Sequence, residues 1–387
     1  MSGKQFLLVV AVLVLLVAGG AGVAWWKRST YEVVDARVGQ RLVPGLKVDD
    51  VAAIVIADAQ GTVTLVRGDR GWSVQERGGF PAELDPIRDL LVKLAELKVL
   101  QVDALSDAIR PRMRLAAPGS GAKPQDTGVA VTLKGRDGEA IAQLVLGKQA
   151  FRSAEVAGMG GGIASGRYVW TAADPQRVNV VNEPFSNVAS KAPQWLAREL
   201  ARVERIQSVT AIGADGKERW SVSKDTEAGD WRLAGTGKLD PGKAQDAASA
   251  LYGLQLADAA VDVSDAEAGL DQPTKIRAQT FDGWAYELEI GKPASADRYY
   301  AKSAVIGNLP DARPSAPDEK AADKERADQA FAERKAALGA TLERERAVAG
   351  RTVLVARAAV EPLLRDRGAL LAIDKPKEKD TAKAPKK

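Results

Sequence analysis

Short stretches of alternating apolar and polar residues follow residue 50 of the chain. The segments VAAIVIAD (51–58), TVTLVRG (62–68) and WSVQE (72–76) alternate with a period of two, and glycine-rich breaks separate them. This alternation is typical of half-buried strands, because successive side chains of a strand point to opposite faces of the sheet. The pattern therefore predicts a meander of short strands.

An amphipathic helix is predicted directly after this meander. In the sequence LDP, Asp85 is suited to cap a helix and Pro86 to occupy its first turn. The apolar residues behind it keep helical spacing: Ile87, Leu90, Leu91, Leu94 and Leu97. We expect this face to pack on the sheet. The strand pattern then returns in VAVTLKG (129–135) and AIAQLVLG (140–147).

The same order of signals occurs a second time, from Ile206 onward. A second LDP lies at residues 239–241, and apolar residues again follow it with helical spacing: Ala244, Ala247, Ala248, Leu251 and Leu254. Three short motifs also recur: RLAAP (114–118) as GLDQP (269–273), LVLGKQA (144–150) as LEIGKPA (288–294), and RYV (167–169) as RYY (298–300). We interpret the chain as two tandem α+β modules, at residues 48–200 and 201–372. Gly147 and Gly291 are expected where a strand ends.

The second module contains a charged segment that the first lacks. Residues from about 308 to 350 are rich in Ala, Glu, Lys and Arg, which predicts an exposed helix or helical hairpin inserted into a strand connection. Phe331, Leu338 and Leu342 form a thin apolar stripe on it. We treat these three as possible partner contacts, because a protruding helix is marginally stable alone. A packing seam within the chain is the alternative.

An uncharged apolar run at residues 6–26 has about the length that crosses a bilayer as a helix. Trp25 and Trp26 end it and Lys27 and Arg28 follow, as expected of residues that anchor a span at the membrane interface. We predict a retained transmembrane anchor at residues 1–28 and a linker at 29–47. A cleaved signal peptide is the alternative, since residues 18–24 are small. The rest of the chain has no second such run.

Composition excludes several kinds of chemistry. The 387 residues include neither cysteine nor histidine, so disulfides, a thiolate nucleophile, a Cys/His zinc site and an imidazole base are impossible. The net charge is +4, but residues 373–387 hold six lysines against three acidic residues, a surplus of three. The remaining chain is nearly neutral and lacks the basic stripe of a nucleic-acid binder. We predict that the lysine-rich tail is disordered.

Individual motifs give no catalytic, cofactor-binding or metal-binding residues. GMGGGIASG (158–166) lacks the Lys-Ser or Lys-Thr of a phosphate-binding loop and is interpreted as a hairpin loop. Ser221 and Lys224 match the spacing S-x-x-K, but in a strand they would point to opposite faces. The tryptophans are either buried anchors or stacking platforms for a sugar or peptide: Trp72, Trp195, Trp231 and Trp284.

From about Val48 to Leu371, the twice-repeated order of strand, tryptophan, LDP helix, GLDQP-like turn, hairpin, LGK and RYV resembles a known family. It is the bacterial membrane-anchored family that carries the domain of unknown function numbered forty-three forty. The resemblance implies an extracytoplasmic part behind an amino-terminal anchor, often associated with ABC transporters of the gliding-motility type. It implies no catalytic residues.

We therefore expect a non-enzymatic accessory or scaffold protein, anchored by a single span in the bacterial cytoplasmic (inner) membrane with its bulk in the periplasm or extracytoplasmic space. The expected partners are subunits of an ABC transporter or of another membrane complex, with no nucleic acid and no cofactor. The alternative function is a glycan- or lipid-binding protein that uses the cleft between the two modules, and a hydrolase is the third possibility.

Overall fold

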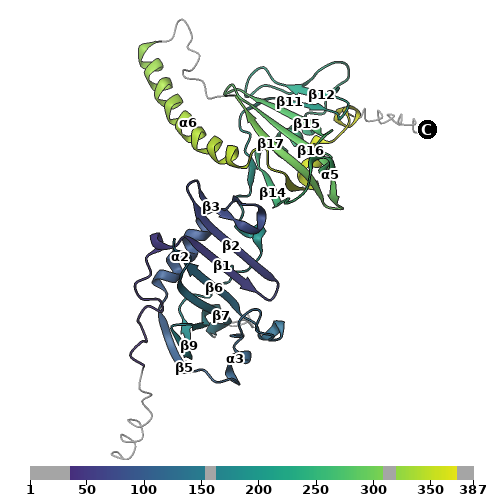
Figure 1. The fold of residues 1–387 in the computed structure, drawn as a ribbon. Coiled ribbons are helices and arrows are strands. Elements are labelled where there is room, and N and C mark those ends of the chain that lie inside the picture. Colours follow the sequence, from purple (N-terminus) through teal and green to yellow (C-terminus); the bar gives the residue numbers. More distant parts are fainter. Residues whose placement is uncertain (1–34, 153–162, 308–319, 373–387) are drawn as a thin grey trace, which may run out of the picture. The chain divides into compact units, whose positions relative to one another are not determined.

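The computed structural model describes residues 35–152, 163–307 and 320–372, and the predicted anchor lies outside these ranges. The described chain is an α+β protein with two mainly antiparallel sheets and few helices (Figure 1). This agrees with the predicted fold class. Among the helices of the described ranges, none combines the length and apolar character that a bilayer crossing requires.

The first sheet has the strand order β4-β3-β2-β1-β6-β7-β8-β9-β5. Its strands are β1 (Ala53–Asp58), β2 (Gly61–Gly68), β3 (Gly71–Val74), β4 (Phe80–Pro81), β5 (Val99–Ala104), β6 (Val129–Lys134), β7 (Ala140–Arg152), β8 (Ile163–Thr171) and β9 (Asp174–Val181). The pairs β1–β2, β2–β3, β7–β8 and β8–β9 are antiparallel, as a meander requires.

The second sheet has the order β10-β14-β18-β17-β16-β15-β11-β12-β13. Its strands are β10 (Glu199–Ala201), β11 (Ile206–Ile212), β12 (Glu218–Ser223), β13 (Arg232–Leu233), β14 (Leu254–Ala259), β15 (Thr274–Thr280), β16 (Ala285–Ser295), β17 (Arg298–Ile306) and β18 (Val353–Ala356).

Eight strands follow the same order in both sheets. The first sheet contains the series β3-β2-β1-β6-β7-β8-β9-β5, and the second contains β13-β12-β11-β15-β16-β17-β18-β14. Numbered along the chain, the strands of the two series correspond one to one: β1, β2 and β3 to β11, β12 and β13, β5 to β14, and β6, β7, β8 and β9 to β15, β16, β17 and β18. A duplicated unit would produce this correspondence, and its origin in a tandem duplication stays a prediction.

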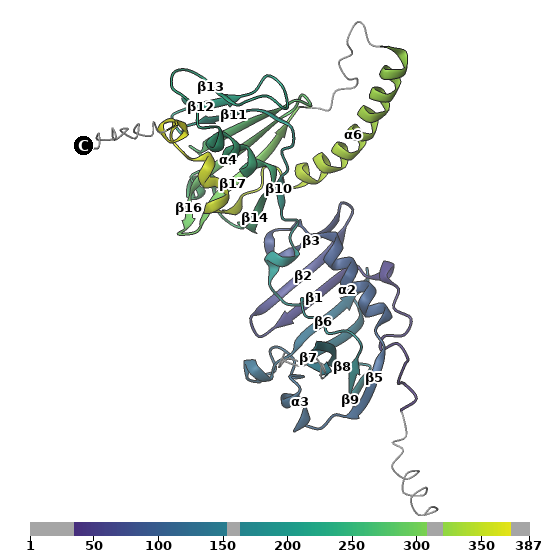
Figure 2. The same ribbon diagram turned by 180° about the vertical axis from the view of Figure 1, so that it is seen from behind.

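The helices of the described chain are α2 (Leu84–Glu96), α3 (Ile109–Arg112), α4 (Pro241–Tyr252), α5 (Asp265–Ala268), α6 (Ala321–Val348) and α7 (Arg357–Val360), with 3-10 turns at Val48–Asp50, Gln75–Arg77, Pro124–Asp126, Ala192–Trp195, Glu361–Leu363 and Arg367–Leu370. Two pairs of helices lie at corresponding places along the chain: α2 with α4, and α3 with α5. Figure 2 shows α2 on a face of the first sheet and α4 on a face of the second.

Two compact units can be distinguished in the chain. One comprises residues up to Val48, Leu91–Thr132 and Ile141–Val188, and the other comprises Asp49–Leu90, Leu133–Ala140 and the chain from Ala189 onward. This division differs from the predicted modules at 48–200 and 201–372. Each sheet, however, lies within one predicted module, apart from the start of β10. We call the first of these compact parts the first unit.

The core follows the periodicity of the sequence. All five apolar residues expected on the inner face of the first helix are buried: Ile87, Leu90, Leu91, Leu94 and Leu97, of which Leu97 directly follows the last residue of α2. In the second helix, Ala244, Ala247, Ala248 and Leu251 are the buried residues of α4, whereas Leu254, expected on the same face, begins β14. Asp240 caps α4 by accepting a hydrogen bond from the Gly242 backbone N–H, whereas α2 begins at Leu84, so Asp85 lies inside its first turn.

The repeated LGK motif marks a bulge and not a strand end. Gly147 lies inside β7, and the register with β8 shifts between Leu146 and Gln149. Gly291 lies inside β16, where the register with β17 shifts between Ile290 and Pro293. The expectation that these glycines end a strand was wrong, because an extra residue is accommodated while the strand continues.

A helix-end carbonyl approaches each of these glycines. A Cβ on Gly147 would lie 2.3 Å from the carbonyl oxygen of Met113, which follows α3. A Cβ on Gly291 would lie 2.1 Å from the carbonyl oxygen of Ala268, the last residue of α5. Only glycine allows this approach. We call the two contacts the glycine joints.

Each joint continues into a buried leucine. The Leu115 N–H donates to the Arg110 carbonyl at 2.9 Å, and the Leu270 N–H donates to the Asp265 carbonyl at 2.7 Å. The residue before each leucine is left-handed, with φ 55° at Arg114 and 67° at Gly269. Residues 110–115, in and after α3, therefore occupy the same places relative to the first sheet that residues 265–270, in and after α5, occupy relative to the second.

Part of the segment predicted as a linker, residues 29–47, is folded. The structure describes this segment from residue 35 onward. The Leu42 N–H donates to the Leu97 carbonyl at 2.7 Å, and the Gly39 N–H donates to the Val99 carbonyl at 2.8 Å. Arg41 also forms a bridge with Lys98. These backbone hydrogen bonds hold residues 39–42 against the start of β5, so this part of the segment belongs to the folded unit.

The helix α6 lies within the predicted insertion at 308–350 and connects β17 to β18, which pair directly. Its three buried residues, Leu342, Glu345 and Val348, fall within its last seven positions, although the helix has 28 residues. Most of its length is therefore exposed.

We predict that Gly147→Ala and Gly291→Ala each lower the free energy of unfolding by about 1–3 kcal/mol, because the added methyl group overpacks the joint. Gly61→Ala is the matched control, since a Cβ there meets no heavy atom within 4 Å. Urea unfolding measures the three changes. Unfolding of Gly147→Ala at the urea concentration of Gly61→Ala would contradict the close approach.

Candidate functional sites

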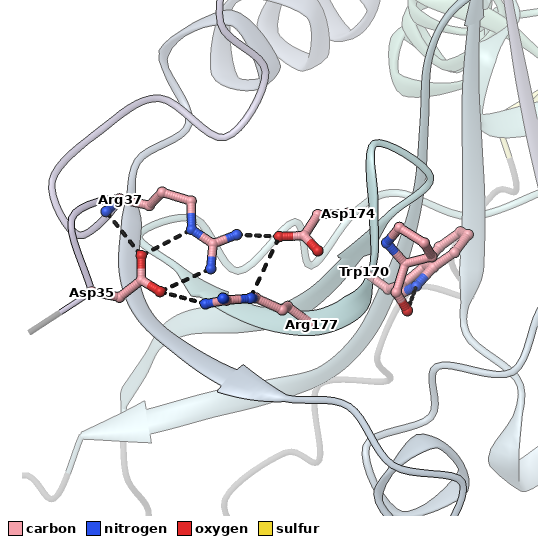
Figure 3. A network of polar contacts seen from close by, with 6 residues as sticks. Asp35, Arg37, Trp170, Asp174 and Arg177 are labelled. Carbon is pink, nitrogen blue, oxygen red and sulfur yellow. Dashed lines mark hydrogen bonds and ion pairs between the residues drawn. The ribbon is translucent and has the colours of Figure 1, made fainter.

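Four charged residues tie the start of the described chain to β9 (Figure 3). Asp35 accepts hydrogen bonds from the backbone N–H of Arg37 at 3.0 Å and from its Nε at 2.9 Å. Arg37 also forms an ion pair with Asp174 at the start of β9. Arg177 of the same strand donates to Asp35 at 2.5 Å. Two carboxylates and two guanidinium groups thus alternate in one network.

The network is charge-balanced. The side-chain hydrogen bond from Arg37 holds the pKa of Asp35 well below its usual value, and the charges of Arg37 and Arg177 act in the same direction. Each partner is partly exposed, so a single pair of this kind contributes little, but several charges in a network hold a segment more firmly.

Trp170 connects this network to α3. It lies beside the four charged residues in Figure 3, and its indole N–H donates to the Pro175 carbonyl at 3.0 Å. The guanidinium carbon of Arg110 in α3 lies 5.6 Å from the centroid of the Trp170 ring, within the range of a cation–π interaction. The start of the described chain and α3 therefore lie at the same end of the first unit.

A buried carboxylate attaches α6 to the second sheet. Glu345 is 2% exposed. It accepts hydrogen bonds from the Tyr286 hydroxyl at 2.9 Å and from the Arg202 backbone N–H at 2.7 Å. Burial raises the pKa of Glu345. Burial also raises the pKa of Tyr286, and the charge of Glu345 raises it further, so this hydroxyl stays protonated and remains a donor.

A second attachment lies about three helical turns closer to the start of α6. Arg334 donates to Asp282 at 2.8 Å. Asp282 also forms an ion pair with Arg205, which pairs with Glu227 at 3.0 Å. Asp282 therefore links α6 to the loop that follows β12, through a carboxylate whose side chain is 11% exposed.

The proposed contact residues of α6 differ in their surroundings. Leu342 is 2% exposed, so its side chain packs within the chain and offers no surface to a partner. Phe331 and Leu338 are half-buried and keep part of their surface exposed. The interface residues proposed at the amino terminus, Trp25, Trp26, Lys27 and Arg28, lie outside the described residues.

A depression of about 480 Å³ lies between α4 and the start of β11. Trp231 and Tyr252 line it together with Gln245 and Ser249. The Lys224 ammonium lies 5.1 Å from the centroid of the Trp231 ring, and Tyr252 is 51% exposed. An aromatic surface next to amide and hydroxyl groups suits a ligand that carries both apolar faces and hydroxyls, such as a sugar.

The tryptophans divide between the two interpretations. Trp195 and Trp284 are buried, at 3% and 4% exposed, as expected of core anchors. Trp72 and Trp231 are half-buried. Sequence periodicity did not distinguish these cases, because packing with distant segments decides the exposure of each ring.

Ser221 and Lys224, the residues of the S-x-x-K spacing, do not contact each other through any hydrogen bond of the described structure. Both line a polar depression of about 550 Å³, because β12 ends at Ser223 and the strand alternation does not extend to Lys224. Their side chains have different partners. The Ser221 hydroxyl hydrogen-bonds with that of Thr210 at 2.8 Å, and the Lys224 ammonium donates to the Glu227 carbonyl at 2.7 Å.

The acidic residues and the glycine-rich stretch can be followed only within the described ranges. Among the described residues, no group of three or more acidic side chains could hold a metal ion. Residues 153–162 of the glycine-rich stretch lie outside the described ranges, and its last residues belong to β8, which pairs with β7 from Ile163 onward.

These observations define a two-sheet α+β protein with an attached helix. The family model described as domain of unknown function (DUF4340) matches residues 72–273, which are 202 of the 387 residues. The chain belongs to this family. The match is one continuous stretch that begins in β3 and ends before β15, so it includes parts of both sheets. No curated protein and no solved structure matches the chain.

We predict that Glu345 gives the stability a distinct pH dependence. Because burial raises its pKa in the folded chain above the ordinary 4.5, the folded state binds more protons than the unfolded state between these two values. Stability therefore falls as the pH rises through that window. In Glu345→Gln this fall should disappear, because an amide does not titrate. The variant should still fold, since the amide oxygen can accept from Arg202 and the amide N–H can donate to the Tyr286 oxygen.

Urea unfolding across the acidic to neutral range measures this effect, and Glu218→Gln on the exposed end of β12 is the control. An unchanged pH dependence in Glu345→Gln would show that this carboxylate does not titrate abnormally.

Proposed function

We propose that this protein is a non-enzymatic accessory or scaffold protein, held in the bacterial cytoplasmic membrane by residues 6–26, with its two sheets outside the cytoplasm. Its proposed partners are subunits of an ABC-type transport system. The apolar run and the Trp25-Trp26-Lys27-Arg28 sequence behind it support the anchor.

The network around Asp35 supports a short tether. Six residues lie between Arg28 and Asp35, and the seven steps from one Cα to the other span at most about 25 Å. Because Arg37 is paired with Asp174 of β9, the folded unit begins almost directly after the anchor. This arrangement suits a protein that acts close to the membrane surface.

The exposed part of α6 supports partner binding and is the observation on which this proposal depends. Its attachments, Glu345 to Tyr286 and Arg334 to Asp282, leave the residues before Phe331 exposed or nearly so. An exposed helix of this length gains little from intrinsic propensity alone, so a bound partner would stabilise it. Helix-in-groove docking is a common mode of such recognition.

We predict that a photo-crosslinking residue at Phe331 forms adducts with membrane subunits when the full chain is gently solubilised from its native membrane. The same residue at Thr226, in an exposed loop of the second sheet, is the matched control. Mass spectrometry identifies the adducts. The absence of any adduct at position 331, with the protein present in the membrane fraction, would argue against the scaffold function.

Ligand binding is the second candidate function, and the depression at Trp231 favours it. The Trp231 indole N–H donates to Gln245 Oε1 at 3.4 Å, and Gln245 Nε2 donates to the Ser249 hydroxyl at 3.1 Å, so polar groups lie beside an aromatic ring. The depression at Trp231 is lined only by residues 203–252 of the second module. The ligand site expected from the sequence was a different one, a cleft between the two modules. A saccharide is the ligand class that we propose for it.

We predict that oligosaccharides of the bacterial envelope bind the full chain with an affinity that Trp231→Ala lowers at least tenfold, because the stacking surface is lost. Trp72→Ala, at a half-buried tryptophan of the first sheet, should leave binding unchanged. Isothermal titration calorimetry measures both variants. Equal affinities in the two variants would exclude this site.

A further inference from the structure

A group of cations, most of them exposed, surrounds the glycine joint of the first unit. Arg110 and Arg112 belong to α3, Arg114 follows it, and Lys148 follows the joint in β7. Arg112, Arg114 and Lys148 are exposed, and within the described chain none of the three has a carboxylate partner. The joint itself brings them together, since the Lys148 N–H donates to the carbonyl of Met113 at 2.8 Å.

A half-buried cation lies beneath them. Arg167 of β8 donates from Nε to the Gly147 carbonyl and from Nη1 to the Phe185 carbonyl, both at 2.8 Å. Its acceptors in the described structure are backbone carbonyls, which leave its positive charge uncancelled. Burial lowers the pKa of Arg167 to about 10, and the charge of Arg114 lowers it as well, so the guanidinium stays protonated at neutral pH. We call these five residues the cationic surface.

The corresponding helix of the second sheet carries the opposite charge. Arg110 occupies the place of Asp265, and Arg112 that of Glu267. Asp265 pairs with Lys302 at 2.6 Å, and Glu267 completes a capping box with Ser264. The joint therefore forms equally well with acidic residues on its helix, and the fold does not require the positive charge of α3.

The cationic surface lies at the end of the first unit where the chain enters. Arg110 contacts Trp170, Trp170 hydrogen-bonds to Pro175, and the neighbouring Asp174 is paired with Arg37. The four charges around Asp35 balance one another, and Asp107 is the acidic residue of the segment 105–118, which contains three arginines. The net charge of this segment is therefore +2.

We propose that the cationic surface binds the anionic headgroups of the membrane in which the chain is anchored. This inference rests on the proposed function, because the short connection to the anchor brings this end of the first unit close to the bilayer. Basic side chains near an anionic bilayer are attracted to it, and a tryptophan such as Trp170 is suited to the interface. The second sheet, with acidic residues at the same place, lacks this attraction.

The absence of cysteine allows a direct test. The full chain carries a single cysteine, either Ala108→Cys beside α3 or Ala266→Cys in α5, labelled with an environment-sensitive fluorophore. Both positions are exposed. Each protein is reconstituted into vesicles of phosphatidylcholine alone or with added phosphatidylglycerol, and quenching by headgroup-labelled lipid is measured. We expect several-fold stronger quenching at position 108 in the anionic vesicles, with no change at position 266.

Charge reversal identifies the residues responsible. Arg112→Glu, Arg114→Glu and Lys148→Glu together should reduce quenching at position 108 to its level in neutral vesicles. The matched control, Lys217→Glu, Lys238→Glu and Lys292→Glu, changes the net charge equally on the second sheet and should have no effect. Raised salt should weaken the quenching, because it screens charges.

The two proposals fail separately. Loss of the chain from vesicles of both compositions on flotation would overturn the anchor, and the cationic surface is then tested by adding the full chain to preformed anionic vesicles. Quenching at position 108 that is equal in both lipid mixtures, or unchanged by the triple reversal in α3 and β7, would overturn the lipid-binding surface while leaving the anchor intact.

Discussion

The close approach of a helix-end carbonyl to a strand glycine organises both sheets. At Gly147 and Gly291 a methyl group would lie within 2.3 Å of that carbonyl oxygen, so the strand and the short helix can meet only where the side chain is absent. Each joint brings the side chains of its short helix next to those of the strand that contains the glycine. In the first unit it brings the arginines of α3 to Lys148, and in the second sheet it places two acidic residues at the same points. One backbone contact thus supports two surfaces of opposite charge.

Charge is used differently at the two ends of the described chain. Around Asp35, partly exposed ion pairs hold a segment in place at little desolvation cost. At Glu345, a carboxylate is taken out of water and offset by two hydrogen-bond donors, which makes the attachment of α6 directional and sensitive to protonation. The first arrangement suits a permanent connection. The second suits a helix whose attachment can respond to its surroundings.

Much of the fold could be predicted because it depends on local pattern. Alternation located the central strands, and helical spacing identified the four buried residues of α2 together with Leu97, which directly follows it. Exposure of aromatic residues could not be predicted, since Trp195 and Trp231 occur in similar local sequence but differ in packing. The end of β12 at Ser223 was also not predicted, so the strand alternation assumed for Ser221 and Lys224 does not extend to Lys224.

The sequence by itself determined the α+β class, the repeated order of elements and the position of the charged insertion, since each depends on the spacing of residues along the chain. It also contained every residue of the cationic surface, but scattered over residues 110–167 with no common motif. Only the tertiary structure decided that these residues adjoin, that Glu345 is buried and that Leu342 packs inward. Those properties depend on which segments meet in space, and the glycine joints and the sheet order determine that meeting.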